Sequence, residues 1–200
     1  MSAAPVRRTQ AERREATREA LIAAGRRLFA ERGYADVASE ELVAAAGVTR
    51  GALYHHFDGK LGLFEAVYEA VEQDLVARFP LERLVGDDPF ATLKVAVGEV
   101  LELGLDPEVH QIALVDAPAV LGWEKWHEIE LRYGLGLIIA SLTAAAEAGQ
   151  IRELPVEELA TVLLGALLEA SHYVSRAEDR DGALERTRVV LEALLDGLRP

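Results

Sequence analysis

The chain contains no cysteine, one methionine and only 6% aromatic residues. Zinc fingers, iron–sulfur centres and thiol nucleophiles all need a thiolate, so the absence of cysteine excludes them, and it excludes a disulfide scaffold as well. We expect no metal site, no cofactor and no catalytic residues. Because 50% of the 200 residues are hydrophobic, the chain can still bury a substantial core, and intrinsic disorder is not expected.

Long hydrophobic runs are also missing. The longest stretch without a charged residue covers residues 133–146, and its 14 residues are fewer than the roughly 20 that a membrane-spanning helix needs. The first residues are charged and lack the apolar segment of a secretory signal. We therefore expect a cytoplasmic protein that does not enter a membrane.

The formal net charge of −13 is divided unevenly along the chain. Residues 1–60 contain ten basic and eight acidic residues, whereas residues 61–200 contain eleven basic and twenty-six acidic ones. Residues 1–32 alone hold eight arginines and four glutamates. This division predicts that any contact with nucleic acid is made by the N-terminal part, and that the acidic body stays away from it.

Hydrophobic periodicity predicts an all-α fold. Apolar residues recur at helical spacing along nearly the whole chain, and no hairpin dipeptide lies between alternating runs. A first helix is expected over residues 9–32 and is ended by Gly33. Its apolar face consists of Leu21, Ala24, Gly25, Leu28 and Phe29.

Two short helices follow. The first is expected over residues 39–46 and stops at Gly47, and the second covers residues 50–56, with the Thr49 hydroxyl as its N-cap. Two short helices joined by a tight glycine turn are typical of a helix-turn-helix, here over residues 38–57. With the first helix they form a three-helix DNA-binding domain, expected at residues 10–58.

The segment over residues 33–60 reads GYADVASEELVAAAGVTRGALYHHFDGK. Its Gly-Tyr pair, its Ala-Ala-Gly-Val turn, its helix Thr-Arg-Gly-Ala-Leu-Tyr-His-His-Phe and the lysine that follows resemble the DNA-binding region of the TetR family of bacterial transcriptional regulators. The resemblance covers residues 10–75, and the rest of the chain matches in helical character only. It implies an N-terminal helix-turn-helix domain joined to a larger α-helical ligand-binding and dimerisation domain, residues 59–200.

The start of the third helix carries the expected contacts to DNA. Its small and polar residues can approach base edges in a major groove, and they are Thr49, Arg50, Gly51 and Ala52. One turn further on, Tyr54 and His55 can reach phosphate or sugar. The sequence leaves open whether Arg50 binds a guanine or a phosphate, and whether Tyr54 contacts DNA or packs half-buried.

Further contacts are expected beside this helix. Lys60 lies in the first turn of a long helix over residues 59–79, where its ammonium and the free backbone amides can together hold one phosphate. Ser39 matches a family position that commonly holds a hydroxyl residue touching phosphate, although N-capping is an equally good interpretation. Four arginines can add phosphate contacts or simply begin a solvated helix: Arg7, Arg8, Arg13 and Arg14.

The chain departs from the family pattern near the second helix. Val37 and Ala38 stand where hydroxyl residues are common, and Gly59 stands where a capping Ser or Asn is common. Asp58 is the expected replacement cap for the long helix.

The acidic body is expected to contain helices over residues 90–105, 109–115, 122–148, 156–177 and 182–198. The last two are apolar on more than one side, which favours a self-complementary dimer interface. The resemblance likewise implies that these two helices pair into a four-helix bundle. The expected partners are therefore a second copy of the chain and a palindromic double-stranded DNA operator.

The resemblance also places a ligand cavity between the long helix and this bundle. The candidates there are Trp123, Trp126, His127, Glu130, His172 and Tyr173. Aromatic residues at helical spacing also build ordinary cores, so the sequence leaves their role open. Aromatics beside a carboxylate would suit a cationic or an extended apolar ligand.

Three functions are compatible with these patterns. The first is a homodimeric, ligand-responsive regulator, by family default a repressor, that a small molecule releases from its operator. The second is a DNA-binding dimer without a small-molecule effector. The third, an all-α enzyme that uses the histidines and carboxylates of the body, has no catalytic motif to support it, so we expect no enzyme.

Overall fold

The computed structural model describes residues 9–80, 82 and 87–200, so Arg7 and Arg8 lie outside the described residues. Within these ranges all regular secondary structure is helical, which confirms the all-α prediction. The elements are α1 (Gln10–Arg32), α2 (Ser39–Ala45), α3 (Arg50–His56), α4 (Gly59–Ala77), α6 (Pro89–Leu103), α7 (Pro107–Val109), the π-helix η1 (His110–Asp116), α8 (Ala117–Arg132), α9 (Gly134–Glu147), α10 (Val156–Ser175) and α11 (Arg180–Asp196).

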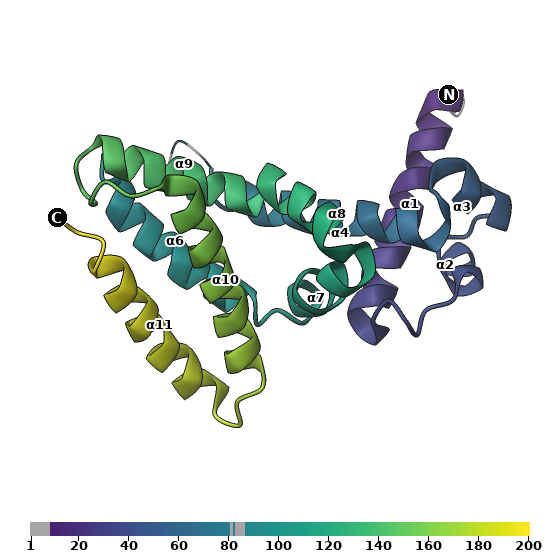
Figure 1. Ribbon diagram of the computed structural model, residues 1–200. Helices are drawn as coiled ribbons and strands as arrows, with labels where there is room; N and C mark the ends of the chain where they lie inside the picture. Colours follow the sequence, from purple (N-terminus) through teal and green to yellow (C-terminus); the bar gives the residue numbers. More distant parts are fainter. Residues whose placement is uncertain (1–8, 81, 83–86) are drawn as a thin grey trace, which may run out of the picture.

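The helices form an elongated molecule with a small and a large end (Figure 1). Helices α1, α2 and α3 lie together at the small end, and α4 runs from them into the body. Helices α6, α9, α10 and α11 pack against one another at the far end of the body. Between the two ends, η1 and α8 pack against α4, and α7 packs against α1.

Local sequence signals determine the helix boundaries at the small end. Gly33 and Gly47 have φ 76° and 66°, a conformation that favours glycine, and they end the first two helices as expected. The Thr49 hydroxyl accepts the backbone N–H of Ala52 at 3.3 Å, which confirms the predicted N-cap of α3.

Two apolar cores hold the molecule together. The first joins the small end to the body, because Leu21, Phe29, Leu53 and Phe64 belong to the same buried cluster as Ile129 of α8. The second fills the far end between α6, α9, α10 and α11. The first core continues past residue 58, so the division into residues 10–58 and 59–200 stays a prediction.

The expectations for three boundaries were wrong. The helix expected over residues 122–148 is broken at Tyr133. The backbone at Gly136 lies so close to the Leu131 carbonyl oxygen that a Cβ on residue 136 would be only 2.8 Å from this oxygen. The segment expected at 109–115 is a π-helix preceded by α7. Asp58 is the N-cap residue of α4, but its side chain makes no capping hydrogen bond, so the expected cap is wrong as well.

In the ranges that the structure describes, no single helix has the length and hydropathy of a membrane-spanning helix. That length and hydropathy are found only when two segments, Pro107–Arg132 and Gly134–Glu147, are taken together. The two segments are bent by 48° at the break between them.

Candidate functional site

Helix α3 presents its polar side to solvent. Leu53 is fully buried and anchors the helix to the first core. The residues predicted to contact DNA lie on the other side: Thr49, Arg50, Gly51, Tyr54 and His55 are exposed, and Ala52 is half-buried. The structure therefore brings these six residues together on one accessible surface.

Arg50 is held by weak contacts only. Its Nη1 atom lies 3.0 Å from Glu40 Oε1, and its guanidinium carbon lies 5.9 Å from the centroid of the Tyr54 ring. Both members of the ion pair are largely exposed, and such pairs contribute only about 0–1 kcal/mol. A phosphate or a guanine can therefore displace Glu40 at little cost.

Tyr54 lies across the beginning of α4. Gly59 has φ 67°, and a Cβ there would lie 3.3 Å from Tyr54 Cε1. The glycine at this position, a departure from the family pattern, thus allows both the left-handed backbone and the close approach of the ring. The Tyr54 side chain nevertheless stays 55% exposed, and its hydrogen bond with Arg50 raises the pKa of that guanidinium.

Lys60 and Ser39 are less exposed than the residues of α3. The Lys60 ammonium lies 4.0 Å from the centroid of the Tyr34 ring, and burial lowers its pKa against the opposing effect of nearby carboxylates. Ser39 is the first residue of α2, and the N-cap is Ala38, whose N–H is accepted by Glu41 Oε2 at 2.9 Å. N-capping by Ser39 is therefore wrong.

Ion pairs and one hydrogen bond join the small end to the body. Arg26 of α1 makes a bidentate pair with Glu108 of α7, at 2.7 and 2.8 Å, and also binds Asp74 of α4. The Tyr34 N–H donates to the Asp116 carboxylate of η1 at 2.7 Å. Movement of η1 relative to α1 would break the Tyr34–Asp116 hydrogen bond, and movement of α7 would break the pair between Arg26 and Glu108.

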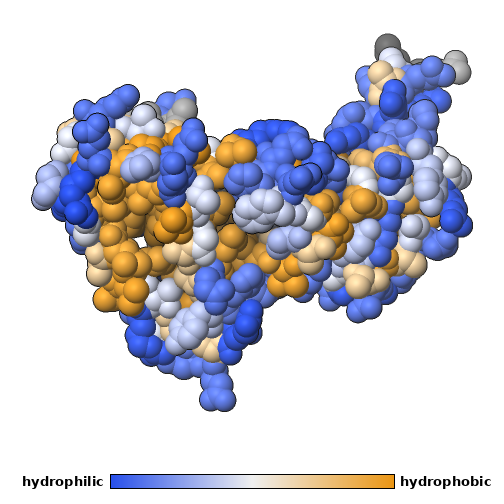
Figure 2. All heavy atoms as spheres, viewed as in Figure 1, coloured by the Kyte–Doolittle hydropathy of each residue, from blue (hydrophilic) through white to orange (hydrophobic). Residues whose placement is uncertain are grey.

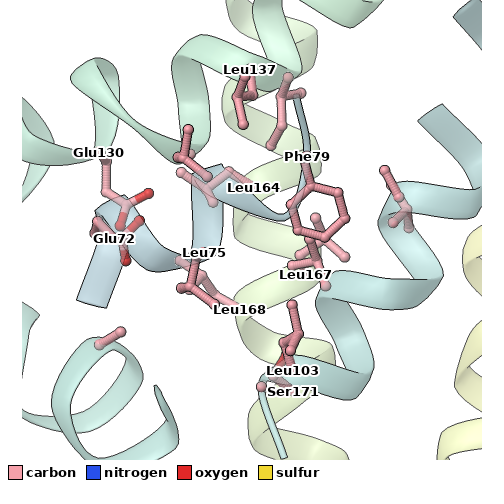
Figure 3. Close-up of a pocket in the computed structure, with 18 of the residues that line it drawn as sticks. Glu72, Leu75, Phe79, Leu103, Glu130, Leu137, Leu164, Leu167, Leu168 and Ser171 are labelled. Carbon is pink, nitrogen blue, oxygen red and sulfur yellow. The ribbon is translucent and has the colours of Figure 1, made fainter. Parts of the chain in front are cut away.

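A largely apolar cavity of about 130 Å³ lies inside the body (Figure 3). Helices α4, α6, α9 and α10 supply most of its wall, and η1 adds Ala113 and Leu114. Figure 3 shows Leu75, Phe79, Leu137 and Leu167 around it, with two carboxylates at one edge. An engineered apolar cavity of about 150 Å³ holds benzene, so this one fits a ligand of one ring.

The two carboxylates belong to Glu72 of α4 and Glu130 of α8, each only 5% exposed. The Tyr68 hydroxyl donates a hydrogen bond to Glu130 Oε1. Burial raises the pKa of both carboxyls, and the negative charge of Glu130 adds to the rise for Glu72. Burial likewise raises the pKa of Tyr68, which therefore stays a neutral hydrogen-bond donor.

Of the six residues predicted to bind a ligand, Glu130 alone lines this cavity. Trp126 is buried in the first core, and Trp123, 66% exposed, stacks on the His127 ring at 5.2 Å. On α10, His172 Nε2 lies 3.2 Å from the Leu114 carbonyl oxygen, and Tyr173 is 59% exposed.

Glu72 was missed by the sequence reasoning. The available signal was its spacing, because it follows Tyr68 by four residues on the helix that buries Val71. A glutamate on the apolar face of a helix is unusual, since a buried charge needs a partner.

Helices α10 and α11 expose apolar side chains in the part of the chain that the structure describes. They are Val162, Tyr173, Val189, Val190 and Leu194. Figure 2 shows hydrophobic residues gathered over the end of the body where α6, α9, α10 and α11 lie. Large exposed apolar patches of this kind mark interaction surfaces.

Comparison with known proteins agrees with this architecture. Residues 21–67 match the model described as bacterial regulatory proteins, tetR family, and residues 91–198 match the tetracyclin repressor-like C-terminal domain. A crystal structure of a TetR-family transcriptional regulator from Pectobacterium atrosepticum is 34% identical, covers 96% of this chain and 98% of that one, and superposes with a TM-score of 0.78.

Two characterised sequences extend the comparison. The TetC protein of transposon Tn10 from Escherichia coli is 26% identical over 85% of this chain and 86% of its own length. The transcriptional repressor BepR of Brucella suis is 36% identical over 54% of this chain and 51% of its own length. The C-terminal domain match alone spans more than half of the 200 residues. The chain therefore belongs to the TetR family, whose members are transcriptional regulators and not enzymes.

Proposed function

We propose that this protein is a homodimeric repressor that binds a palindromic operator through α3 and is released by a small molecule that enters the cavity. The observation that carries the proposal is the position of η1 between the two sites. Ala113 and Leu114 of η1 line the cavity, whereas Asp116 of the same element accepts the Tyr34 N–H at the end of α1. An occupant of the cavity that displaces η1 would therefore move the DNA-binding helices.

The exposed residues of α3 support the DNA-binding part of the proposal. In a dimer, two copies of α3 would enter successive major grooves about 34 to 36 Å apart, which requires a palindromic site. Thr49, Arg50 and Gly51 would approach base edges, and Tyr54, His55 and Lys60 would bind phosphates. Ser39 at the start of α2 is a further candidate for a phosphate contact.

The π-helix supports the ligand-responsive part. π-Helical turns are rare and are found frequently at functional sites. A shift of η1 between two packings would change the spacing of the two DNA-binding ends. A ligand would then need only a higher affinity for the state that fits DNA poorly.

The experiment is a selection of bound duplexes from a random pool, followed by titration of the selected duplex at several salt concentrations. We expect a palindromic sequence, and we expect Tyr54→Ala to weaken its binding by about tenfold, as for the loss of a single good contact. Trp123→Ala is the matched control, because it removes an equally exposed aromatic side chain outside the DNA-binding surface.

Two results would contradict the proposal. One is that no sequence is enriched and that binding depends on salt alone. The other is that Tyr54→Ala and Trp123→Ala affect operator binding equally.

A further inference from the structure

In the part of the chain that the structure describes, no positively charged side chain lines the edge of the cavity formed by Glu72 and Glu130. Among the described residues, no hydrogen bond or ion pair joins the Glu72 carboxyl to another side chain, although it is 5% exposed. The residues that line the cavity in the described ranges include no lysine, arginine or histidine. A buried carboxylate without a partner is costly, so this edge of the cavity favours a ligand that brings a positive charge.

The two carboxylates converge on the backbone of α9 at Gly134, where no side chain separates them from the helix. A Cβ placed on Gly134, the first residue of α9, would lie 3.1 Å from Glu130 Oε2 and 3.8 Å from Glu72 Oε2. Both oxygens thus face the position that a side chain at residue 134 would occupy. Figure 3 shows the two carboxyl groups side by side at this edge, with the apolar lining beyond them.

The remaining wall fits an uncharged hydrocarbon. The lining includes leucines and valines from α4, α6, α9 and α10 together with the Phe79 ring, and its polar exceptions besides the two glutamates are Ser141 and Ser171. The Ser141 hydroxyl already donates to the Leu137 carbonyl oxygen at 2.9 Å. The wall can therefore enclose an apolar body but offers little hydrogen bonding for a polar one.

We propose that the cavity binds a small lipophilic organic cation, with the ammonium group beside the carboxyls of Glu72 and Glu130 and the apolar body among the leucines. This inference rests on the proposed function for the role of the cavity and adds the chemical class of the effector. In the empty protein, burial and the charge of Glu130 raise the pKa of Glu72, so this carboxyl holds a proton more strongly than a free glutamate does. The arriving cation replaces the proton on Glu72, so charge is balanced before and after binding.

The test measures ligand affinity without DNA, by calorimetry on the full-length protein. The probe is benzyltrimethylammonium, a permanent cation with one ring. The comparison compound is 2-methyl-1-phenylpropan-2-ol, which has the same shape and number of non-hydrogen atoms but no charge. We expect the cation to bind at least about tenfold more tightly than the alcohol.

Three variants identify the site. Glu72→Gln removes the charge at constant shape. Gly134→Ala keeps both carboxyls but crowds this edge of the cavity, because its Cβ would lie 3.1 Å from Glu130 Oε2. Each should weaken cation binding at least about tenfold. Glu124→Gln is the control, because it makes the same change of side chain at an exposed position of α8 outside the cavity lining, and it should leave the affinity within about twofold. Thermal melting of each variant verifies that it is folded.

The alcohol binding as tightly as the cation would overturn the inference, because the protonated pair would then be serving a neutral ligand. Equal cation affinity in wild type and Glu72→Gln would overturn it as well. Cation binding that does not release the operator would support the ligand class and contradict the repressor mechanism. If other compounds release the operator while the cation does not bind, the ligand class fails and the repressor mechanism stands.

Discussion

At the scale of single residues, burial changes the chemistry of Glu72 and Glu130 most clearly. Each carboxyl lies in an apolar region, and the two face each other across Gly134. Ionisation of both would place two like charges in a region of low dielectric constant, so the folded protein holds protons that the unfolded chain releases. The stability of the protein must therefore depend on pH through this pair.

We predict that Glu72→Gln makes the protein more stable at neutral pH than the wild type. Below pH about 4.3 the carboxyl is protonated in both the folded and the unfolded chain and contributes no pH dependence. As pH rises, the unfolded chain loses this proton first, because burial raises the pKa in the folded state. The free energy of unfolding of the wild type then falls by up to about 1.4 kcal/mol per pH unit until the folded-state pKa is passed.

Urea unfolding of both proteins between pH 4 and pH 8 measures this difference. The difference in free energy of unfolding between Glu72→Gln and the wild type should grow with pH. Glu124→Gln, at an exposed position of α8, should change stability by less than about 0.5 kcal/mol throughout. A constant gap between Glu72→Gln and the wild type would mean that the pair does not retain protons in the folded protein.

At the scale of elements, the turn between α3 and α4 depends on Gly59. An alanine in the left-handed conformation costs roughly 1–2 kcal/mol. We predict that Gly59→Ala lowers the free energy of unfolding by more than this amount, because its Cβ also presses on the Tyr54 ring. Operator affinity should fall too, since Tyr54 lies on the proposed DNA-binding surface.

Gly47→Ala is a matched control for this prediction. Its φ of 66° is nearly that of Gly59, but a Cβ there has nothing within 4 Å. In chemical unfolding, Gly47→Ala should therefore lose only the stability that corresponds to backbone strain. Its loss of operator affinity should be smaller than that of Gly59→Ala. Equal losses of stability in the two variants would show that the Tyr54 contact at Gly59 has no energetic importance.

The same elements show which features follow from sequence. The cap of α3 by Thr49 and the stops at Gly33 and Gly47 were predictable, because each depends on residues within one turn. The break at Tyr133 was not, because it depends on the close approach of the chain at Gly136 to the Leu131 carbonyl. Residues 122–148 have apolar residues at continuous helical spacing, which predicts one helix, but tertiary contacts break this helix at Tyr133.

The candidate cavity shows a similar division. The aromatic residues of α8 share a helical face as predicted, yet the kink at Gly122, with φ 76°, leaves Trp123 exposed while Trp126 enters the core. Glu72 became a candidate only when the packing of α4 against α8 and α9 was known. Spacing along one helix cannot reveal a pair whose members come from two helices.

At the scale of the whole molecule, exposed apolar residues of α10 and α11 are spaced by whole helical turns. Val162 and Tyr173 are eleven residues apart on α10, about three helical turns, and Val190 and Leu194 are one turn apart on α11. Each pair therefore shares a face of its helix. Two such faces from two copies can pair about a two-fold axis, because each copy presents the same surface.

We predict that Leu194→Glu converts the protein from a dimer to a monomer and abolishes tight operator binding while leaving each chain folded. Leu194 is 62% exposed in the single chain, so the charge costs little there, but in a dimer it would be buried without a partner. Analytical ultracentrifugation measures the association state, and circular dichroism verifies the helix content. Leu154→Glu, at another exposed leucine outside α10 and α11, should remain dimeric. A wild-type protein that sediments as a monomer at all concentrations would contradict the two-fold arrangement, because one α3 helix alone cannot read both halves of a palindrome.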